Sequence, residues 1–319
     1  MDPERQAAIY GFTTYKNYLS GLSHLIDLLH PSYQSITTSL KEIEVRPGID
    51  VSKIRKLLFN SWNSEALLNL PKFLDEDFIK FSNHWSPVQS YYAQYLATRA
   101  LIVGRAMDAG GTHETTLNIC AHNFTDQKIF PEPWNYICGT GPSYKNLPDD
   151  LVESDINSQE NPYFFRRERD KLVCNYRQFL KTTRERMVEE KADEWKSRNP
   201  TTAGVRTRLP GGKRAEIDSS TRRVSFLDCF YRLRTRSNYK DVDIFILGSN
   251  AQDSVSYLNA LCNITDKTLF VLESHIARSI GLEDMKNLVQ QYKLATNIDF
   301  VAKGTAGIAK RIDLMWKLK

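Results

Sequence analysis

The chain has 319 residues, of which 41% are hydrophobic and 25% are charged, a globular composition that excludes collagen-like repeats, coiled-coil arrays and a disordered chain. The longest stretch without a charged residue, residues 81–98, contains several polar side chains, so neither a membrane-spanning segment nor a membrane partner is expected. The net charge of +5 hides an uneven distribution, because residues 161–240 carry +11 and the rest of the chain therefore carries −6.

Apolar residues recur at helical spacing through residues 1–124, the first predicted segment. The expected helices cover residues 13–29, 50–59, 64–81 with a break at Pro71, and 87–107. The glycine pair Gly110-Gly111 follows the last of them, which favours a turn there.

Residues 125–223 differ in character and are predicted to be an insertion. Their first part, to about residue 159, is rich in proline and glycine and indicates an irregular connection. A long helix with a narrow apolar stripe is expected over residues 163–196. Alternating apolar and charged residues around Pro210-Gly211-Gly212 then predict a β-hairpin over residues 205–217.

Helical periodicity returns in the third predicted segment, residues 224–319. Helices are expected over residues 224–245, 253–280 and 282–294, with Gly281 as a C-cap, while the last 25 or so residues give no clear pattern. The predicted fold class is mainly α: a helical bundle formed by the first and third segments, interrupted by a long helix and a β-hairpin.

The remaining polar and sulfur-containing residues indicate no cofactor and no metal site. The five cysteines are odd in number and lack a Cys-x-x-Cys pair, so reduced and mostly buried thiols are expected. His275 is predicted on the solvated face of its helix, because it lies off the apolar stripe. The first residues, Met-Asp-Pro-Glu-Arg-Gln, lack the apolar core of a secretion signal, so a cytoplasmic location is expected.

Several motifs occur in a distinctive order. Ser90-Tyr-Tyr-Ala-Gln-Tyr-Leu-Ala-Thr-Arg-Ala-Leu101 is followed by Thr112-His113, then by Tyr231-Arg-Leu-Arg-Thr-Arg-Ser-Asn-Tyr-Lys-Asp241, and then by the helix from Ala251 to Ile280. The set resembles the HEPN superfamily, the all-α domains of prokaryotic toxins, phage-defence systems and some eukaryotic ribonucleases. The resemblance spans about a third of the chain. It implies a HEPN-like bundle, a homodimer, and as partners RNA or a protein of a toxin–antitoxin or defence system.

The resemblance also implies a site. HEPN ribonucleases typically carry Arg-x4-6-His, whereas this chain has Arg234-x4-Tyr239, as do the Arg-x4-Tyr members of the family. A tyrosine with a pKa near 10 is a poor general base at neutral pH, so His113 of the second motif is the candidate for proton transfer. Arg234, Tyr239 and His113 are therefore the predicted catalytic residues of a metal-independent endoribonuclease.

Three neighbouring residues, Arg232, Arg236 and Asn238, are predicted to bind a phosphate or a nucleotide. On a helix, residues four apart share a face, and guanidinium groups bind phosphate through two parallel hydrogen bonds. The alternative is structural: arginines of this helix pair with Asp228, Asp241 and Asp243 and hold the bundle together. The sequence leaves both interpretations open.

The insertion is the second candidate for nucleic-acid contact, because its basic residues are interleaved with aromatic ones. The predicted contacts are Arg166, Arg167, Arg169, Arg206, Arg208, Lys213, Arg214, Arg222 and Arg223. The alternatives are a solvated helix with a mobile loop, or a surface that binds an acidic protein.

Two functions remain open from the sequence. In the first, the protein binds or cleaves RNA in a toxin or phage-defence role. In the second, a non-catalytic HEPN-like adaptor binds a nucleotide or a partner protein, and the missing Arg-x4-6-His favours this alternative.

Overall fold

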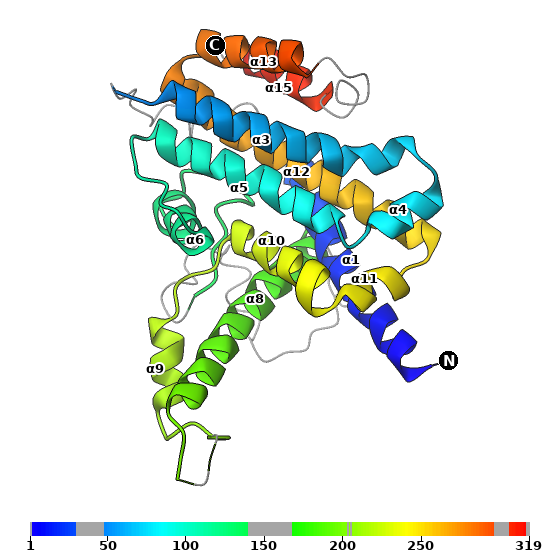
Figure 1. The fold of residues 1–319 in the computed structure, drawn as a ribbon, viewed down its shortest axis with the longest axis vertical. Helices are drawn as coiled ribbons and strands as arrows, with labels where there is room; N and C mark the ends of the chain where they lie inside the picture. The colour runs from blue at the N-terminus through cyan, green and yellow to red at the C-terminus, as the bar shows by residue number, and fades with distance from the viewer. Residues whose placement is uncertain are drawn as a thin grey trace.

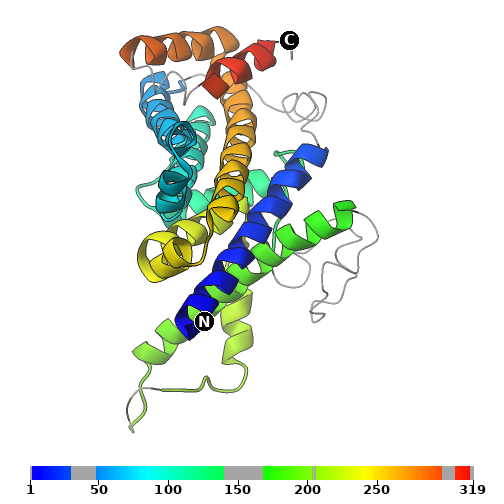
Figure 2. The ribbon, with the colours of Figure 1, turned by 90° about the vertical axis from the view of Figure 1, so that its right-hand side faces the viewer.

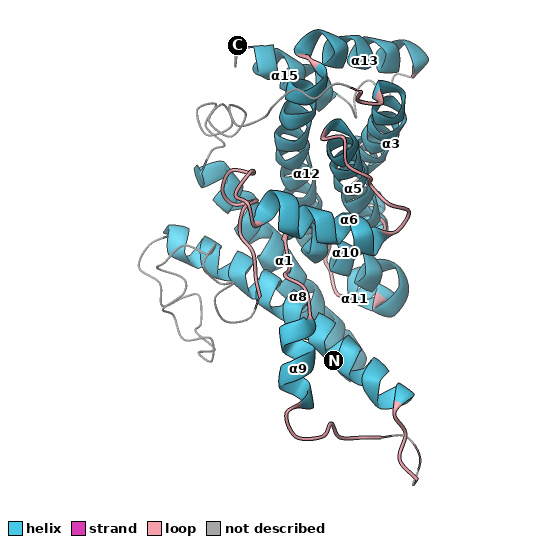
Figure 3. Ribbon diagram, turned by 90° about the vertical axis from the view of Figure 1, so that its left-hand side faces the viewer, coloured by secondary structure: helices cyan, strands magenta, loops and turns pink. Residues whose placement is uncertain are grey.

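The structure is a computed structural model, and it describes residues 2–29, 48–139, 168–202, 204, 206–296 and 306–316. Over these residues the fold is mainly helical and contains no strand, only two isolated β-bridges (Figure 3). The predicted mainly-α class is therefore confirmed. Among the described helices none is both long enough and apolar enough to span a membrane.

Three helices lie side by side and form one layer of the molecule (Figure 1). They are α3 (Val51–Asn69), α5 (Ser86–Gly104) and α12 (Ala251–Ile280). The middle helix, α5, is buried on nearly all sides and therefore lacks the single apolar stripe of a surface helix. Tyr91, Tyr95 and Arg99 follow one face of α5, and that face carries the site described below.

Two long helices cross beneath this layer (Figure 2). They are α1 (Pro3–Leu29) and α8 (Glu168–Arg198). Their close approach depends on Gly21, where an added Cβ would lie 2.6 Å from the Cβ of Asn175. Helix α10 (Phe226–Thr235) packs between α5 and α8.

Shorter elements connect these helices. They are the 3-10 helix η1 (Leu70–Phe73), α4 (Glu76–Ser82), α6 (His113–Ile119), the π-helices η2 (Cys120–Thr125) and η5 (Arg236–Lys240), and α11 (Val242–Leu247). The break expected at Pro71 is present, because α3 ends at Asn69 and Pro71 lies in η1. The single helix predicted over residues 224–245 is wrong, since the chain passes through η5 and bends at Asp241.

The C-terminal helices α13 (Leu282–Ala295) and α15 (Ala306–Trp316) close the top of the molecule (Figure 1). A buried ionic network fastens α15 to α3 and α12. Arg311 donates hydrogen bonds to both carboxylate oxygens of Glu65, to both of Glu273 and to Asp266, at 2.6–2.9 Å.

The main hydrophobic core draws on all three predicted segments, 1–124, 125–223 and 224–319. Phe130 and Tyr176 of the predicted insertion belong to this core, so much of that segment is part of the bundle. The far end of α8 leaves the body and forms an arm with α9 (Lys213–Ser220), and a small separate core lies between them (Figure 1).

The β-hairpin predicted over residues 205–217 is wrong, because residues 206–212 form no strand and residues 213–220 form α9. Gly212, with a φ of +77°, turns the chain immediately before the helix, and Lys213 pairs with Glu216 across the first turn at 2.6 Å. Five residues of alternation are too few to distinguish a strand from one face of a short helix.

The prediction for His275 is wrong, because its side chain is fully buried and packs edge-to-face against Phe130. Helix α12 is enclosed on several sides, so residues off its apolar stripe are buried as well. The prediction for the cysteines is confirmed, because all five are buried and none of them forms a disulfide.

Candidate functional site

The predicted catalytic residues from two distant segments meet on the face of α5 that carries Tyr91 and Tyr95. His113 is the first residue of α6 and Arg234 lies near the end of α10. Around them lie five tyrosines, and together these seven residues form what we call the tyrosine cluster: Tyr91, Tyr92, Tyr95, His113, Tyr231, Arg234 and Tyr239.

His113 is held by two tyrosines of α5. Its Nδ1 lies 2.7 Å from the hydroxyl of Tyr91, and its ring centroid lies 4.5 Å from that of Tyr95. Thr112, the N-cap of α6, accepts a hydrogen bond from the backbone of Thr115 and so fixes the start of the helix. The imidazole therefore has a defined position, while its side chain remains half-buried.

Arg234 is surrounded by aromatic rings and not by carboxylates among the described residues. Its guanidinium carbon lies 5.3–5.8 Å from the ring centroids of four tyrosines, which attract a cation through their π faces. One Nη donates to the hydroxyl of Tyr92 at 3.1 Å, while the buried Nε has no acceptor. No carboxylate of the described residues pairs with Arg234, so this group retains donors for an anion.

The electrostatics favour a neutral imidazole. Burial lowers the pKa of His113, and the nearby charges of Arg234 and Arg99 lower it further. Burial also raises the pKa of Tyr91 well above its usual value, so its hydroxyl stays protonated and orients the imidazole. A neutral histidine beside a free guanidinium is an arrangement suited to moving a proton near a phosphate.

Replacing Arg234 with methionine is expected to raise the pKa of His113, because the variant removes a positive charge that disfavours the imidazolium. NMR titration of the histidine ring protons measures this shift directly. The matched control is Arg206→Met, since Arg206 lies on the arm beside Trp195. An unchanged pKa in Arg234→Met would contradict the electrostatic coupling.

Tyr239 and Asn238 lie in η5, immediately after α10. The ring of Tyr239 lies beside the guanidinium of Arg234, and its side chain is 66% exposed. No hydrogen bond joins Tyr239 to His113 among the described residues. Asn238 is half-buried and is not part of the tyrosine cluster.

Arg232 and Arg236 point to the other side of α10. Arg236 forms an ion pair with Asp241, one of the pairs that the structural alternative predicts. Arg232 donates to the hydroxyls of Thr182 and Thr183 at 2.7 and 3.2 Å, and it lies over the ring of Tyr15. Both arginines line a pocket between α8 and α10 and do not join the tyrosine cluster.

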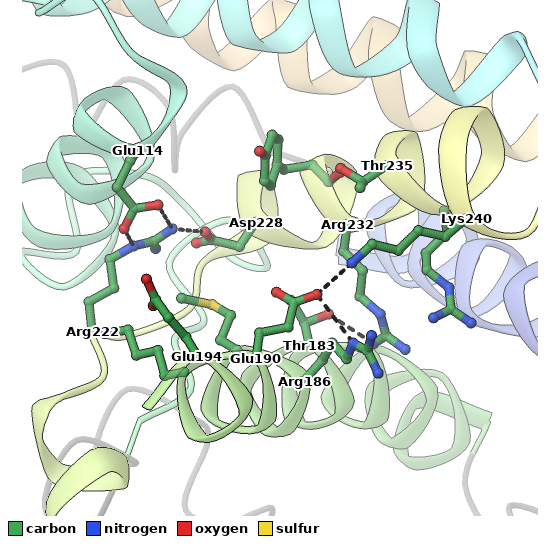
Figure 4. A pocket seen from close by; sticks show the side chains of 14 residues that line it. Glu114, Thr183, Arg186, Glu190, Glu194, Arg222, Asp228, Arg232, Thr235 and Lys240 are labelled. Carbon is green, nitrogen blue, oxygen red and sulfur yellow. Dashed lines mark hydrogen bonds and ion pairs between the residues drawn. The ribbon is translucent and has the colours of Figure 1, made fainter. Parts of the chain in front are cut away.

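This pocket, the α8–α10 pocket, has a volume of about 510 Å³ (Figure 4). At one end Arg222 bridges Glu114 and Asp228, at 2.8 and 2.6 Å. At the other end Glu190 accepts from Lys240 at 2.7 Å and from Arg186 at 3.3 Å. The hydrogen bond and charge of Lys240 outweigh burial and lower the pKa of Glu190, so this end stays ionic.

The basic residues predicted to contact nucleic acid in the insertion differ in how far they are paired with acids. Arg166 and Arg167 lie outside the described residues, and Arg169 is in α8 with its side chain not described. Arg222, Arg223 and Lys213 are paired with carboxylates. Arg206 and Lys213 flank the ring of Trp195, while Arg208 and Arg214 are exposed. Much of the positive charge of residues 161–240 is thus balanced by neighbouring acids.

The sequence pointed to Tyr239 but missed the other four tyrosines of the cluster, Tyr91, Tyr92, Tyr95 and Tyr231. It also missed Arg99, which lies over Tyr95 and donates to the carbonyl of Gly110 at 2.8 Å. A signal existed in Tyr91, Tyr92 and Tyr95, which share one side of a predicted helix. Without knowledge of which helix packs there, the stripe was indistinguishable from core.

Comparison with protein-family models, with curated proteins and with solved structures finds no match. The function is therefore inferred from the site.

Proposed function

We propose that this protein binds RNA at the tyrosine cluster and cleaves it without a metal ion. The observation that carries the proposal is the position of His113, whose pKa is lowered, near Arg234, which has no carboxylate partner among the described residues. The resemblance to HEPN domains adds support, and with it we propose a cytoplasmic toxin or phage-defence role and a homodimer.

The chemistry needs a base, a group that stabilises charge, and a surface for the substrate. In the proposed reaction, Nδ1–H of His113 donates to Tyr91, and Nε2 takes the proton from a ribose 2′-hydroxyl. The 2′-oxygen then attacks the adjacent phosphorus, and the 5′-oxygen leaves with a proton from solvent. Arg234 binds the phosphate oxygens as negative charge develops on them. Exposed Tyr239 offers a ring on which a base stacks.

A non-catalytic adaptor that binds a nucleotide is the second candidate. The observation in its favour is the packing of Arg234 against four rings, which gives this side chain a structural role without any substrate.

Labelled single-stranded RNA, incubated with the protein in the presence and absence of EDTA, separates the two candidates. Under the cleavage proposal, EDTA has no effect and products end in a 2′,3′-cyclic phosphate. His113→Ala and Arg234→Ala each slow cleavage by about a hundredfold or more. The control is His24→Ala, which removes an exposed histidine on α1.

RNA that stays intact at every protein concentration would refute cleavage. Nucleotide binding that persists in the same samples and is lost in Arg234→Ala would then favour the adaptor.

A further inference from the structure

The α8–α10 pocket lies directly beside the tyrosine cluster. His113 and Glu114 are consecutive residues of α6, and His113 belongs to the cluster while Glu114 lines the pocket. Tyr231 also belongs to both, because its ring centroid lies 5.6 Å from that of His113 and its side chain lines the pocket. One aromatic ring therefore separates the proposed reaction centre from the pocket.

The walls of the pocket combine positive charge with apolar surface. Six cations and four carboxylates line it, and all four carboxylates already have basic partners: Glu114, Asp228, Glu190 and Glu194. Lys191 and Arg232 line the pocket without a carboxylate partner among the described residues. This surplus of donors suits a phosphate.

Met187 and Tyr231 give the pocket a surface for a flat aromatic group. A volume of about 510 Å³ lies within the range of small-ligand sites, which matches a single nucleotide. A base enters such a pocket only after it has left the stack of its neighbours, and bases in a duplex resist this step.

We propose that the α8–α10 pocket holds one unstacked nucleotide of single-stranded RNA, next to the phosphate at His113. The inference rests on the proposed function and narrows its substrate class to single-stranded RNA. The chain of the RNA crosses Tyr231, so the nucleotide in the pocket and the reacting phosphate are neighbours.

Fluorescence anisotropy tests this with the His113→Ala variant, which leaves the RNA intact during the measurement. A labelled RNA is measured alone and annealed to its complement. We expect the single strand to bind at least about tenfold more tightly than the duplex. The stacking of one base on an aromatic side chain is sufficient for this difference.

Met187→Trp, in the same background, fills the pocket and is expected to weaken single-strand binding about tenfold. Its control is Leu294→Trp, which adds the same side chain at an 80% exposed position on α13, at the far end of the molecule (Figure 1). Lys191→Gln removes an unpaired cation from the pocket and is compared with Lys293→Gln, on the exposed face of α13. If Met187→Trp does not fold, the comparison of Lys191→Gln with Lys293→Gln tests whether the pocket binds the RNA.

Equal affinity for single strand and duplex, or pocket variants that match their controls, would overturn the inference even where the wild-type protein cleaves RNA. If the pocket variants weaken RNA binding but the wild-type protein never cleaves RNA, the inference is supported and only the cleavage proposal is refuted. RNA that does not bind at all would overturn both.

Discussion

Replacing Arg311 with methionine is expected to lower the free energy of unfolding by about 3–5 kcal/mol. Arg311 is 2% exposed and is the cation among Glu65, Glu273 and Asp266, with hydrogen bonds of 2.6–2.9 Å. Methionine fills similar volume, but it leaves two buried carboxylates without a positive partner. Burying these carboxylates without a cation destabilises the fold by more than the original ion pairs stabilise it.

Urea unfolding at pH 7, followed by circular dichroism, measures this loss. The control is Arg198→Met, because Arg198 is 74% exposed and its partner among the described residues is Glu194 on the same helix, so its loss is below about 1 kcal/mol. Adding Glu65→Gln and Glu273→Gln to Arg311→Met is expected to recover part of the stability.

The deficit of Arg311→Met also depends on pH. Burial raises the pKa of Glu65 even with Arg311 present, and Arg311 opposes that rise. Without the arginine, the pKa of Glu65 in the folded state rises further above its value in the unfolded state. Protonated Glu65 then stabilises the folded variant below the unfolded-state pKa, and this stabilisation is lost as pH rises through the folded-state pKa. A deficit that is equal at pH 5 and pH 8 would contradict this origin.

The sequence predicted the helices well where the apolar stripe is long. Residues 253–280 and 282–294 were expected to be helical, and α12 and α13 cover Ala251–Ile280 and Leu282–Ala295. Over many turns the 3.6-residue period is unambiguous. Short segments are different, since residues 213–217 fit a strand and a helix equally well and only the chain reversal at Gly212 and the packing of Ile217 on α8 select the helix.

The candidate site was only partly predictable because it is assembled from three segments. The sequence pointed to His113 and Arg234, but their contact depends on how α6 and α10 pack against α5. Tyr91 and Tyr95 complete the cluster and were read as core residues of a helix. The local sequence shows which residues share a helix face. It does not show which distant helices come into contact, because that depends on the packing of the whole core.

Charge along the sequence is likewise a poor guide to charge at the surface. Arg222 lies in the basic stretch, yet its partner Glu114 is 108 residues away and Asp228 is buried beside it. The hydrogen bonds and charges of these two acids raise the pKa of Arg222 although burial lowers it. A net charge counted over residues 161–240 therefore overstates the positive charge that a nucleic acid would meet at the surface, because the count leaves out acidic residues from other segments that pair with these arginines.

A buried neutral histidine makes the stability of the protein fall steeply in mild acid. Burial, together with a smaller contribution from the charge of Arg105, lowers the pKa of His275 to about 3. Neither ring nitrogen has a hydrogen-bond partner among the described residues, and the side chain is fully buried. In the unfolded chain the pKa is about 6.5, so the unfolded state binds this proton first.

A folded-state pKa below the unfolded value gives stability that is complete above about pH 6.5 and is lost as pH falls toward 3. Over the interval from pH 7 to pH 4 the expected loss from His275 alone is about 3 kcal/mol in the free energy of unfolding.

His275→Leu isolates this contribution, because the variant removes the titrating group, keeps an apolar side chain of similar volume beside Phe130, and leaves every carboxylate in place. Unfolding free energies from urea titrations at pH 7 and pH 4 are expected to fall by about 3 kcal/mol less in this variant than in the wild type. His24→Leu, at an exposed position on α1, is expected to follow the wild-type curve. Parallel curves for His275→Leu and wild type would show that His275 takes up its proton equally in both states, and that the core around α12 admits water.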